Sequence, residues 1–427
     1  MFETAAAMLA CRTVVDEEAQ AFLGRLEYLG GPPELIPHRS ALLLVAARFL
    51  RIFGLRAPDA PNLVVLGAQV DPQAFGLGPG PVGDVAGTGL SFREAFESCV
   101  GEGVEYASQF MSADDPVALL PEDDALAGAS PALHELWTRL AGYRRRARHT
   151  PTAWVNAADL ASGEPVRVPV DLCFRRPPDL RDLDPPWPLS TGTGAGLGPL
   201  DAALHGLLEL VERDAVALWW RGGRPAHVIS NASGNAMLEH LRGGPTHRRA
   251  WLLDVTSDVG VPVVVAASCN DDGFGLCCGF AARPTQAKAA EAAVREMAQM
   301  ELAHHLSEVK RQTQGEACLS ELDRRHIERF RSIDVKTTRA LHPVAPPRRL
   351  QDLPEAEGLV TLRMIRQGLE SVGLSPCVLN LTRSEIGVPA VRVLCPGLEI
   401  AMTSPPGPRL QVAASDSGFD PTSAAPL

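Results

Sequence analysis

Two pairs of glutamates are the residues of this chain best suited to bind a metal ion. Glu102 and Glu105 form one pair, and Glu209 and Glu212 form the other. Residues three positions apart lie on one face of a helix, so each pair presents two carboxylates together, at a small cost in helix stability that a cation would offset. Carboxylate oxygens suit Mg²⁺, which binds one or two carboxylates along with phosphate oxygens and water.

Both pairs lie within a segment that occurs twice, at an offset of 107 residues. The offset pairs Gly87 with Gly194, Gly89 with Gly196, Leu90 with Leu197, Ala95 with Ala202, Glu102 with Glu209, Val104 with Val211 and Glu105 with Glu212. Glycines directly before a helix leave its first amides accessible to an anion. A single pair of this kind is usually a solvated helix face and a single Gly-x-Gly a turn, but the duplication favours a site for Mg²⁺ and a triphosphate. It is not a P-loop, because the chain has no GxxxxGK[ST] sequence.

The elements that must position these residues alternate between helices and short strands, which predicts an α/β (α+β) fold. Helical periodicity covers residues 5–29, 39–55, 91–110, 200–220 and 285–306. Strand-like runs cover residues 62–66, 154–158, 166–172, 251–255, 261–267, 274–280 and 390–394.

Composition narrows the functional classes. The chain has 427 residues, 45% of them hydrophobic, and a formal net charge of -11, which argues against a non-specific nucleic-acid binder. We expect no signal peptide and no membrane span, because the apolar runs are too short. The nine cysteines include no CxxC pair, so we expect reduced thiols in a cytoplasmic protein.

At these residues the chain resembles the YcaO family, from about residue 80 to 410. The resemblance rests on four motifs in order: Ser98, Glu102 and Glu105; the run Gly-Leu-Leu-Glu-Leu-Val-Glu-Arg-Asp-Ala at 206–215; Glu296 with Gln299; and Leu381-Thr382-Arg383, Gly387, Pro389, Arg392-Val393 and Pro396-Gly397-Leu398-Glu399. Four ordered motifs are far more specific than any one of them.

The resemblance implies a YcaO fold in which pseudo-symmetric, duplicated sheet-plus-helix subdomains carry the nucleotide site. It divides the chain into a mostly helical N-terminal region at 1–75, a YcaO domain at 80–410 and a flexible tail at 411–427.

The resemblance also implies a cyclodehydratase that uses ATP and Mg²⁺. A Cys, Ser or Thr side chain of a ribosomally made precursor peptide attacks the preceding backbone carbonyl, and phosphorylation of that oxygen lets it leave, giving a thiazoline or oxazoline. Glu102, Glu105, Glu209 and Glu212 are the implied Mg²⁺ ligands, with Ser98, Arg213, Glu296 and Gln299 around the nucleotide. Peptide thioamidation is the alternative product.

The implied partners are the precursor peptide, a separate protein that binds its leader and a flavin dehydrogenase acting downstream, with a homodimer as the default oligomer. No segment before residue 75 reads as a leader-binding module. The basic run at 144–148 is either a solvated loop or a docking site for an acidic leader peptide.

Four positions depart from the family pattern, and they open a second reading. Thr88, Tyr106 and Ala292 stand where Lys, Arg and Arg are common, and Glu301 stands where many members have Arg. Lost cations around a tetra-anionic ligand weaken its binding. The alternative is therefore a non-catalytic YcaO-like subunit that holds a peptide or a partner enzyme, although the presence of all four glutamates argues against it.

Overall fold

The computed structural model describes residues 1–11, 16–146, 150–229, 232–344, 346–347, 352–353, 358–401 and 405–422. The chain divides into two compact units, each built from separate stretches of sequence. Unit 1 comprises residues 1–55, 64–207 and 376–394, and unit 2 comprises residues 56–63, 208–375 and 395–427. Helices and several antiparallel sheets are mixed in both, which confirms the predicted α/β class.

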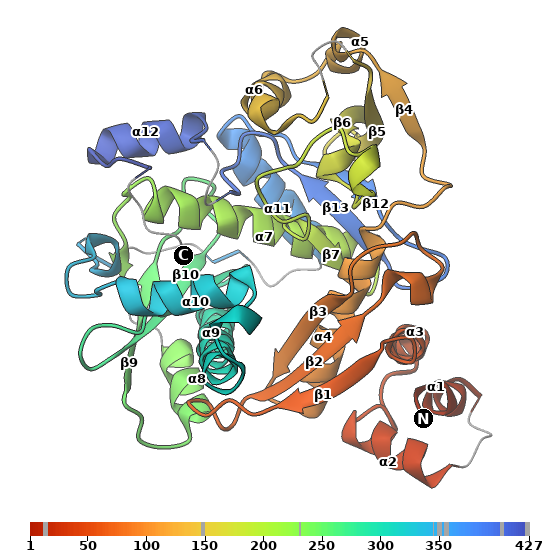
Figure 1. The fold of residues 1–427 in the computed structure, drawn as a ribbon, viewed down its shortest axis with the longest axis vertical. Helices are drawn as coiled ribbons and strands as arrows, with labels where there is room; N and C mark the ends of the chain where they lie inside the picture. Colours follow the sequence, from red (N-terminus) through yellow and green to blue (C-terminus); the bar gives the residue numbers. More distant parts are fainter. Residues whose placement is uncertain are drawn as a thin grey trace. The chain divides into compact units, whose positions relative to one another are not determined.

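Unit 1 holds two sheets and the helices of the first half of the chain (Figure 1). Its helices are α1 (Phe2–Cys11), α2 (Glu17–Arg25), α3 (Ile36–Ala46), α4 (Phe92–Ser108), α5 (Glu122–Leu126), α6 (Pro131–Arg139) and the first half of α7 (Pro199–Trp220). Its strands are β1 (Arg51–Leu55), β2 (Val64–Val70), β3 (Gly83–Gly89), β4 (Val117–Leu120), β5 (Thr152–Asp159), β6 (Pro165–Pro169), β7 (Thr193–Ala195), β12 (Cys377–Asn380) and β13 (Ala390–Leu394).

The smaller sheet of unit 1 has the strand order β1-β2-β3, and α4 packs against β2 and β3 (Figure 1). The helix predicted over 39–55 was wrong in its second half, because α3 ends at Ala46 and residues 51–55 form β1. Arg51 pairs with Gln69 and Leu55 with Val65 along β2. Tertiary pairing therefore overrides the local helical periodicity there.

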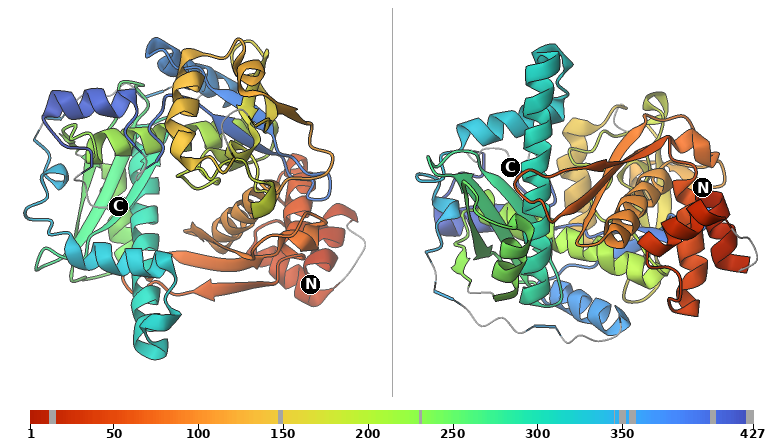
Figure 2. Two further views of the ribbon diagram at one scale, coloured as in Figure 1. Left: turned by 45° about the horizontal axis from the view of Figure 1, so that its top comes forward. Right: turned by 90° about the horizontal axis from the view of Figure 1, so that it is seen from below.

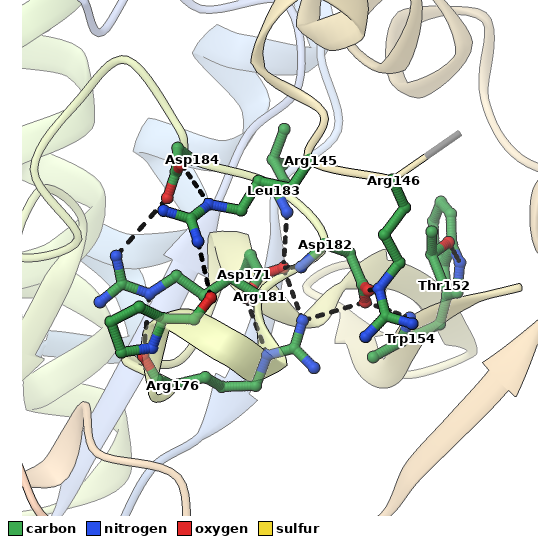
Figure 3. A network of polar contacts seen from close by, with 12 residues as sticks. Arg145, Arg146, Thr152, Trp154, Asp171, Arg176, Arg181, Asp182, Leu183 and Asp184 are labelled. Carbon is green, nitrogen blue, oxygen red and sulfur yellow. Dashed lines mark hydrogen bonds and ion pairs between the residues drawn. The ribbon is translucent and has the colours of Figure 1, made fainter. Parts of the chain in front are cut away.

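The larger sheet of unit 1 has the order β4-β5-β12-β13-β7, with β6 beside β5. The buried Arg392 of β13 donates to the carbonyl oxygens of Leu172, Leu189 and Thr191. A neighbouring network joins Asp171, Arg176 and Asp182 (Figure 3), with Arg176 Nη2 2.6 Å from Asp171 Oδ2 and 3.0 Å from Asp182 Oδ2.

The basic run at 144–148 contributes to this network. Arg144 bonds Glu122 at 3.0 Å, and Arg145 and Arg146 bond Asp184 and Asp182 (Figure 3). Arg148 lies outside the described residues. The three described arginines thus hold unit 1 together, which favours neither a solvated loop nor a docking site for an acidic peptide.

Unit 2 is built on one sheet of order β11-β10-β9-β8, comprising β8 (His227–Val228), β9 (Arg248–Asp254), β10 (Val263–Asn270) and β11 (Cys277–Ala282). Helix α9 (Gln286–Gln314) lies along β10 and β11, and α8 (Ala232–Arg242) and α10 (Glu321–Ser332) pack against α9 (Figure 2). The remaining helices are α11 (Gly358–Ser371) and α12 (Pro408–Ser417). The tail boundary predicted at residue 411 falls inside α12, whose Arg409 bonds the buried Asp214 at 2.8 Å.

One strand-to-helix unit recurs three times, and each copy starts from the edge strand of a sheet. The pairs are β3 with α4, β7 with α7, and β11 with α9. In each, a glycine lets the strand touch the helix backbone. A Cβ at Gly87 would lie 2.1 Å from Cys99 N, one at Gly194 would lie 2.2 Å from Ala202 O, and one at Gly279 would lie 2.1 Å from Met297 N. The third copy has a longer connection before its helix, which hides it from a search for repeats at fixed spacing.

Adding a methyl group at these contacts should damage the fold. We expect Gly87→Ala to lower the free energy of unfolding by about 3 kcal/mol, because the added Cβ meets helix backbone that cannot move aside. Gly54→Ala, in the same sheet, is the matched control, because nothing lies within 4 Å of its Cβ position. Urea denaturation midpoints of the two variants give the comparison. Equal midpoints would mean that the close contact between β3 and α4 is not required.

No helix among the described residues combines the length and the apolarity needed to cross a membrane.

Candidate functional site

The first glutamate pair lies on α4 in unit 1. Glu102 is exposed and Glu105 is half-buried, and the exposed Ser98 lies one turn before Glu102. Glu105 Oε1 accepts a hydrogen bond of 2.9 Å from the amide of Ala195 on β7. Because β7 is an edge strand, this bond satisfies a backbone amide that no neighbouring strand can reach. The helix of the first copy is thereby tied to the strand of the second.

The second pair lies on α7 in unit 2 and repeats this arrangement. Glu212 is 7% exposed and its Oε2 accepts from the amide of Ala282 on β11 at 3.3 Å. Strand β11 is again the edge of its sheet. Arg213 lies between the two carboxylates, with Nη2 3.5 Å from Glu209 Oε1 and Nε 3.9 Å from Glu212 Oε1. The helix of the second copy is therefore tied to the strand of the third.

Helix α9 adds a further carboxylate to the cluster in unit 2. Glu296 Oε2 accepts from the amide of Phe280 at 3.0 Å, also on the open edge of β11. Gln299, one turn later, is half-buried. Unit 2 thus brings Glu209, Glu212, Arg213 and Glu296 together, whereas Ser98, Glu102 and Glu105 form their own group in unit 1.

The cluster in unit 2 holds more negative than positive charge in a buried setting. Burial raises the pKa of Glu212, with Arg213 opposing the shift and Glu296 and Glu209 adding to it. Burial also raises the pKa of Glu296, again opposed by Arg213. Buried carboxylates that disfavour their own ionisation are stabilised by an added cation.

The sequence did not identify Arg283 as part of this cluster. It directly follows Ala282, the residue whose amide holds Glu212, and its charge lowers the pKa of both Glu212 and Glu296. The signal available was its place between the end of a strand and the Pro284 that precedes α9. Arg283 supplies a cation in a chain that lacks three others.

Two departures from the family pattern have structural roles. Tyr106 donates a hydrogen bond of 2.5 Å to Pro81 O, and its ring packs edge-on against Phe110 at 5.2 Å between centroids. Glu301 is buried in ion pairs with Arg242 and Arg248. Ala292 is buried and Thr88 is half-buried. Neither Tyr106 nor Glu301 is therefore simply a lost phosphate contact.

The donor set fits Mg²⁺. Both pairs offer only carboxylate oxygens, which are hard ligands, and two carboxylates leave room for phosphate and water in an octahedral shell. Over the described ranges, no three His, Cys, Asp or Glu side chains gather as a ready-made metal centre. A nucleotide would have to supply further ligands, as Mg²⁺ sites commonly require.

Comparisons with known proteins agree with this donor set. A family model described as YcaO cyclodehydratase, ATP- and Mg²⁺-binding, matches residues 86–399. An "Uncharacterized protein in tfuA 3'region" from Rhizobium leguminosarum bv. trifolii is 27% identical over 270 residues, 58% of this chain and 61% of that protein. An "Uncharacterized protein" from Methanothermobacter thermautotrophicus is 28% identical over 355 residues, 76% of this chain and 84% of that one. The chain thus spans less than two thirds of the first relative.

Solved structures share the fold. A "Heterocyclase in complex with substrate and Cofactor" superposes with a TM-score of 0.66 at 22% identity, covering 86% of this chain and 52% of that one. YcaO from Methanopyrus kandleri, bound with AMPPCP and Mg²⁺, gives 0.59 at 22% identity, covering 85% and 91%. The E. coli microcin synthetase McbBCD complex with pro-MccB17 gives 0.61 at 14% identity, covering 87% and 96%.

Proposed function

Because the chain belongs to the YcaO family, we propose that it uses ATP and Mg²⁺ to activate backbone amides of a ribosomally made peptide, closing thiazoline or oxazoline rings at Cys, Ser or Thr. One observation carries this proposal. The two carboxylate pairs occur on equivalent helices, and each places its second glutamate against an amide of an edge strand. A solvated helix face has no reason to repeat such an anchor.

We assign the Mg²⁺ ions to Glu102, Glu105, Glu209 and Glu212. Ser98, Arg213, Glu296 and Gln299 surround the nucleotide, with Arg283 as an additional cation. ATP supplies the phosphoryl group that turns the amide oxygen into a leaving group. The residues of the chain contribute fixed charges aimed at the phosphates, which stabilise charge most effectively where water is excluded.

The substrate and partners form part of the proposal. A relative of the fold is a heterocyclase bound to substrate, and another is a synthetase complex bound to pro-MccB17. We infer that this chain acts on a precursor peptide that a separate leader-binding protein delivers, ahead of a flavin dehydrogenase.

The competing function is a scaffold subunit that binds a peptide or an enzyme without turning over ATP. The missing cations at Thr88 and Ala292 favour it. The internal bonds of Tyr106 and Glu301, and the charge of Arg283, weigh against it. We therefore favour the enzyme, with azolines as its product in preference to thioamides.

Ring formation provides the test. The intact chain is incubated with Mg-ATP, its leader-binding protein and a panel of peptides that contain Cys, Ser or Thr, and mass spectrometry records the products. Closing one azoline removes one water, so we expect a mass loss of about 18 Da per ring together with release of phosphate. Mg-ATP binding without any mass change would favour the scaffold, and a sulfur-for-oxygen exchange would indicate thioamidation.

A further inference from the structure

A pocket of about 280 Å³ opens in unit 1 beside the first glutamate pair. Helix α4 lines it with Glu97 and Gly101, and α7 lines it with Asp201 and His205. The residues that follow β7, including Ala195, form its floor, and Leu42 and Val388 are among its apolar walls. The pocket therefore combines apolar surface with a few polar groups, as sites for small peptide segments do.

Ala195 connects this pocket to the first glutamate pair. Its amide donates to Glu105 Oε1 at 2.9 Å, and its carbonyl oxygen lies 2.9 Å from His205 Nδ1. Both backbone groups of a strand residue point to the same side of the strand, so Glu105 and His205 are held at one open edge of β7. A ligand in the pocket would thus lie next to a proposed Mg²⁺ ligand.

The hydrogen bond to Ala195 also fixes the chemistry of His205. A carbonyl oxygen can only accept, so Nδ1 carries the proton, and the neutral ring keeps its lone pair on Nε2. Asp201 Oδ1 lies 3.7 Å from Nε2, and Asp201 Oδ2 is held by the amide of Leu197 at 3.1 Å. The carboxylate would therefore stabilise the imidazolium that forms when Nε2 takes up a proton.

The repeat supplies an independent indication that His205 faces a ligand. At the offset of 107 residues, His205 stands in the second copy where Ser98 stands in the first. Ser98 is a position that the family resemblance places at the nucleotide. The same hydrogen bond opens both copies, from Leu90 to Glu94 and from Leu197 to Asp201. His205 is 53% exposed at its side chain and thus accessible.

The other charged groups of the pocket are already engaged. Arg39 lies with Nε 4.0 Å from Glu97 Oε1 and its guanidinium 4.6 Å from the centre of the Tyr28 ring. Burial lowers the pKa of His38, although Asp201 partly opposes the shift. His38 is therefore neutral near pH 7, which leaves His205 as the lining base best supported by a carboxylate.

We propose that this pocket receives the reacting Cys, Ser or Thr side chain of the peptide, and that His205 is the catalytic base that removes its proton. The proton moves from sulfur or oxygen to Nε2 of His205. The resulting thiolate or alkoxide forms a bond to the preceding carbonyl carbon, and the electron pair of the C=O bond moves onto its oxygen. This step rests on the proposed function.

The test uses the full chain and two capped peptides, acetyl-Gly-Cys-N-methylamide and acetyl-Gly-Ser-N-methylamide. His205→Asn keeps a donor for Ala195 but cannot accept a proton. We expect it to slow ring formation about 10²–10⁴-fold, and to slow the Ser peptide more than the Cys peptide, because a thiol ionises more readily without help. Mg-ATP affinity by calorimetry should stay within about twofold. His240→Asn, at an exposed histidine in α8, is the matched control.

Each outcome decides the proposal. If His205→Asn forms rings at the wild-type rate, with the wild-type Ser-to-Cys ratio and pH profile, the proposal is wrong. If the wild-type protein forms no rings at all, the proposed function fails, and ¹⁵N NMR of His205 Nε2 during titration with the Cys peptide tests the pocket separately. A shift that Gly101→Leu abolishes supports the pocket, because the space beside Gly101 is open. No shift overturns it.

Discussion

The variant Glu209→Gln/Glu212→Gln is expected to lose Mg²⁺-dependent binding of ATP while remaining folded. Glutamine keeps an oxygen that can accept from the Ala282 amide, so the tie between α7 and β11 survives. The change removes the two charges that would bind the metal. A hydrogen bond to a charged group contributes about 1.5–3 kcal/mol, so the loss of two such contacts should weaken binding at least about 100-fold.

Isothermal titration calorimetry with ATP, at high Mg²⁺ and again with EDTA, measures this effect. Glu239→Gln is the control, because Glu239 is an exposed glutamate on α8 in the same unit. Circular dichroism and the melting temperature show whether each variant is folded. Unchanged affinity in the double variant would remove α7 from the nucleotide site. If the folded wild-type chain does not bind ATP either, the scaffold function replaces the enzyme.

The second large effect is expected at Glu301, whose replacement by Ala should lower the free energy of unfolding by about 3–5 kcal/mol. Glu301 accepts from Arg242 at 2.6 and 2.8 Å, from Arg248 at 2.8 Å and from Ser268 at 2.5 Å. The side chains of Glu301, Arg242 and Arg248 are 3%, 5% and 6% exposed. Removing the carboxylate would leave two buried cations without their shared counter-charge.

The dependence on pH gives this prediction a second measurement. Burial raises the pKa of Glu301, but the hydrogen bond from Arg242 and the charges of Arg248 and Arg242 outweigh it and hold the pKa below its usual range. A depressed pKa stabilises the folded state above the pKa of the unfolded chain, and this stabilisation is lost as the pH falls through the folded pKa. The difference between wild type and Glu301→Gln should therefore be largest near pH 7 and shrink below about pH 4.5.

Urea denaturation at pH 7 and pH 4 tests both statements. Glu321→Ala is the control, because its ion pair with Arg325 is exposed and contributes about 1 kcal/mol or less. Replacing Glu301, Arg242 and Arg248 together by apolar residues should cost far less than removing Glu301 alone, because no charge then stays buried without a partner. An equal loss in the single and triple variants would contradict the ion-pair explanation.

Local patterns were enough to predict much of the site. The repeat at an offset of 107 residues identified Glu102, Glu105, Glu209 and Glu212, and helical spacing placed each pair on one face. These features depend on neighbours within one or two helical turns, so they can be recognised in the order of the residues. The helix predicted over 39–55 shows the limit, because residues 51–55 become a strand only through pairing with β2.

What the sequence determined by itself is the repeated strand–glycine–helix unit, the carboxylate pairs and the family to which they belong. Only the tertiary structure decided what these groups contact. It tied Glu105 to Ala195 and Glu212 to Ala282, added Arg283 and the third copy around Gly279, enclosed Glu301 between two arginines, and set His205 beside a pocket. These contacts join residues that are tens of positions apart, and burial and charge at such contacts depend on how distant segments pack, which no local spacing encodes.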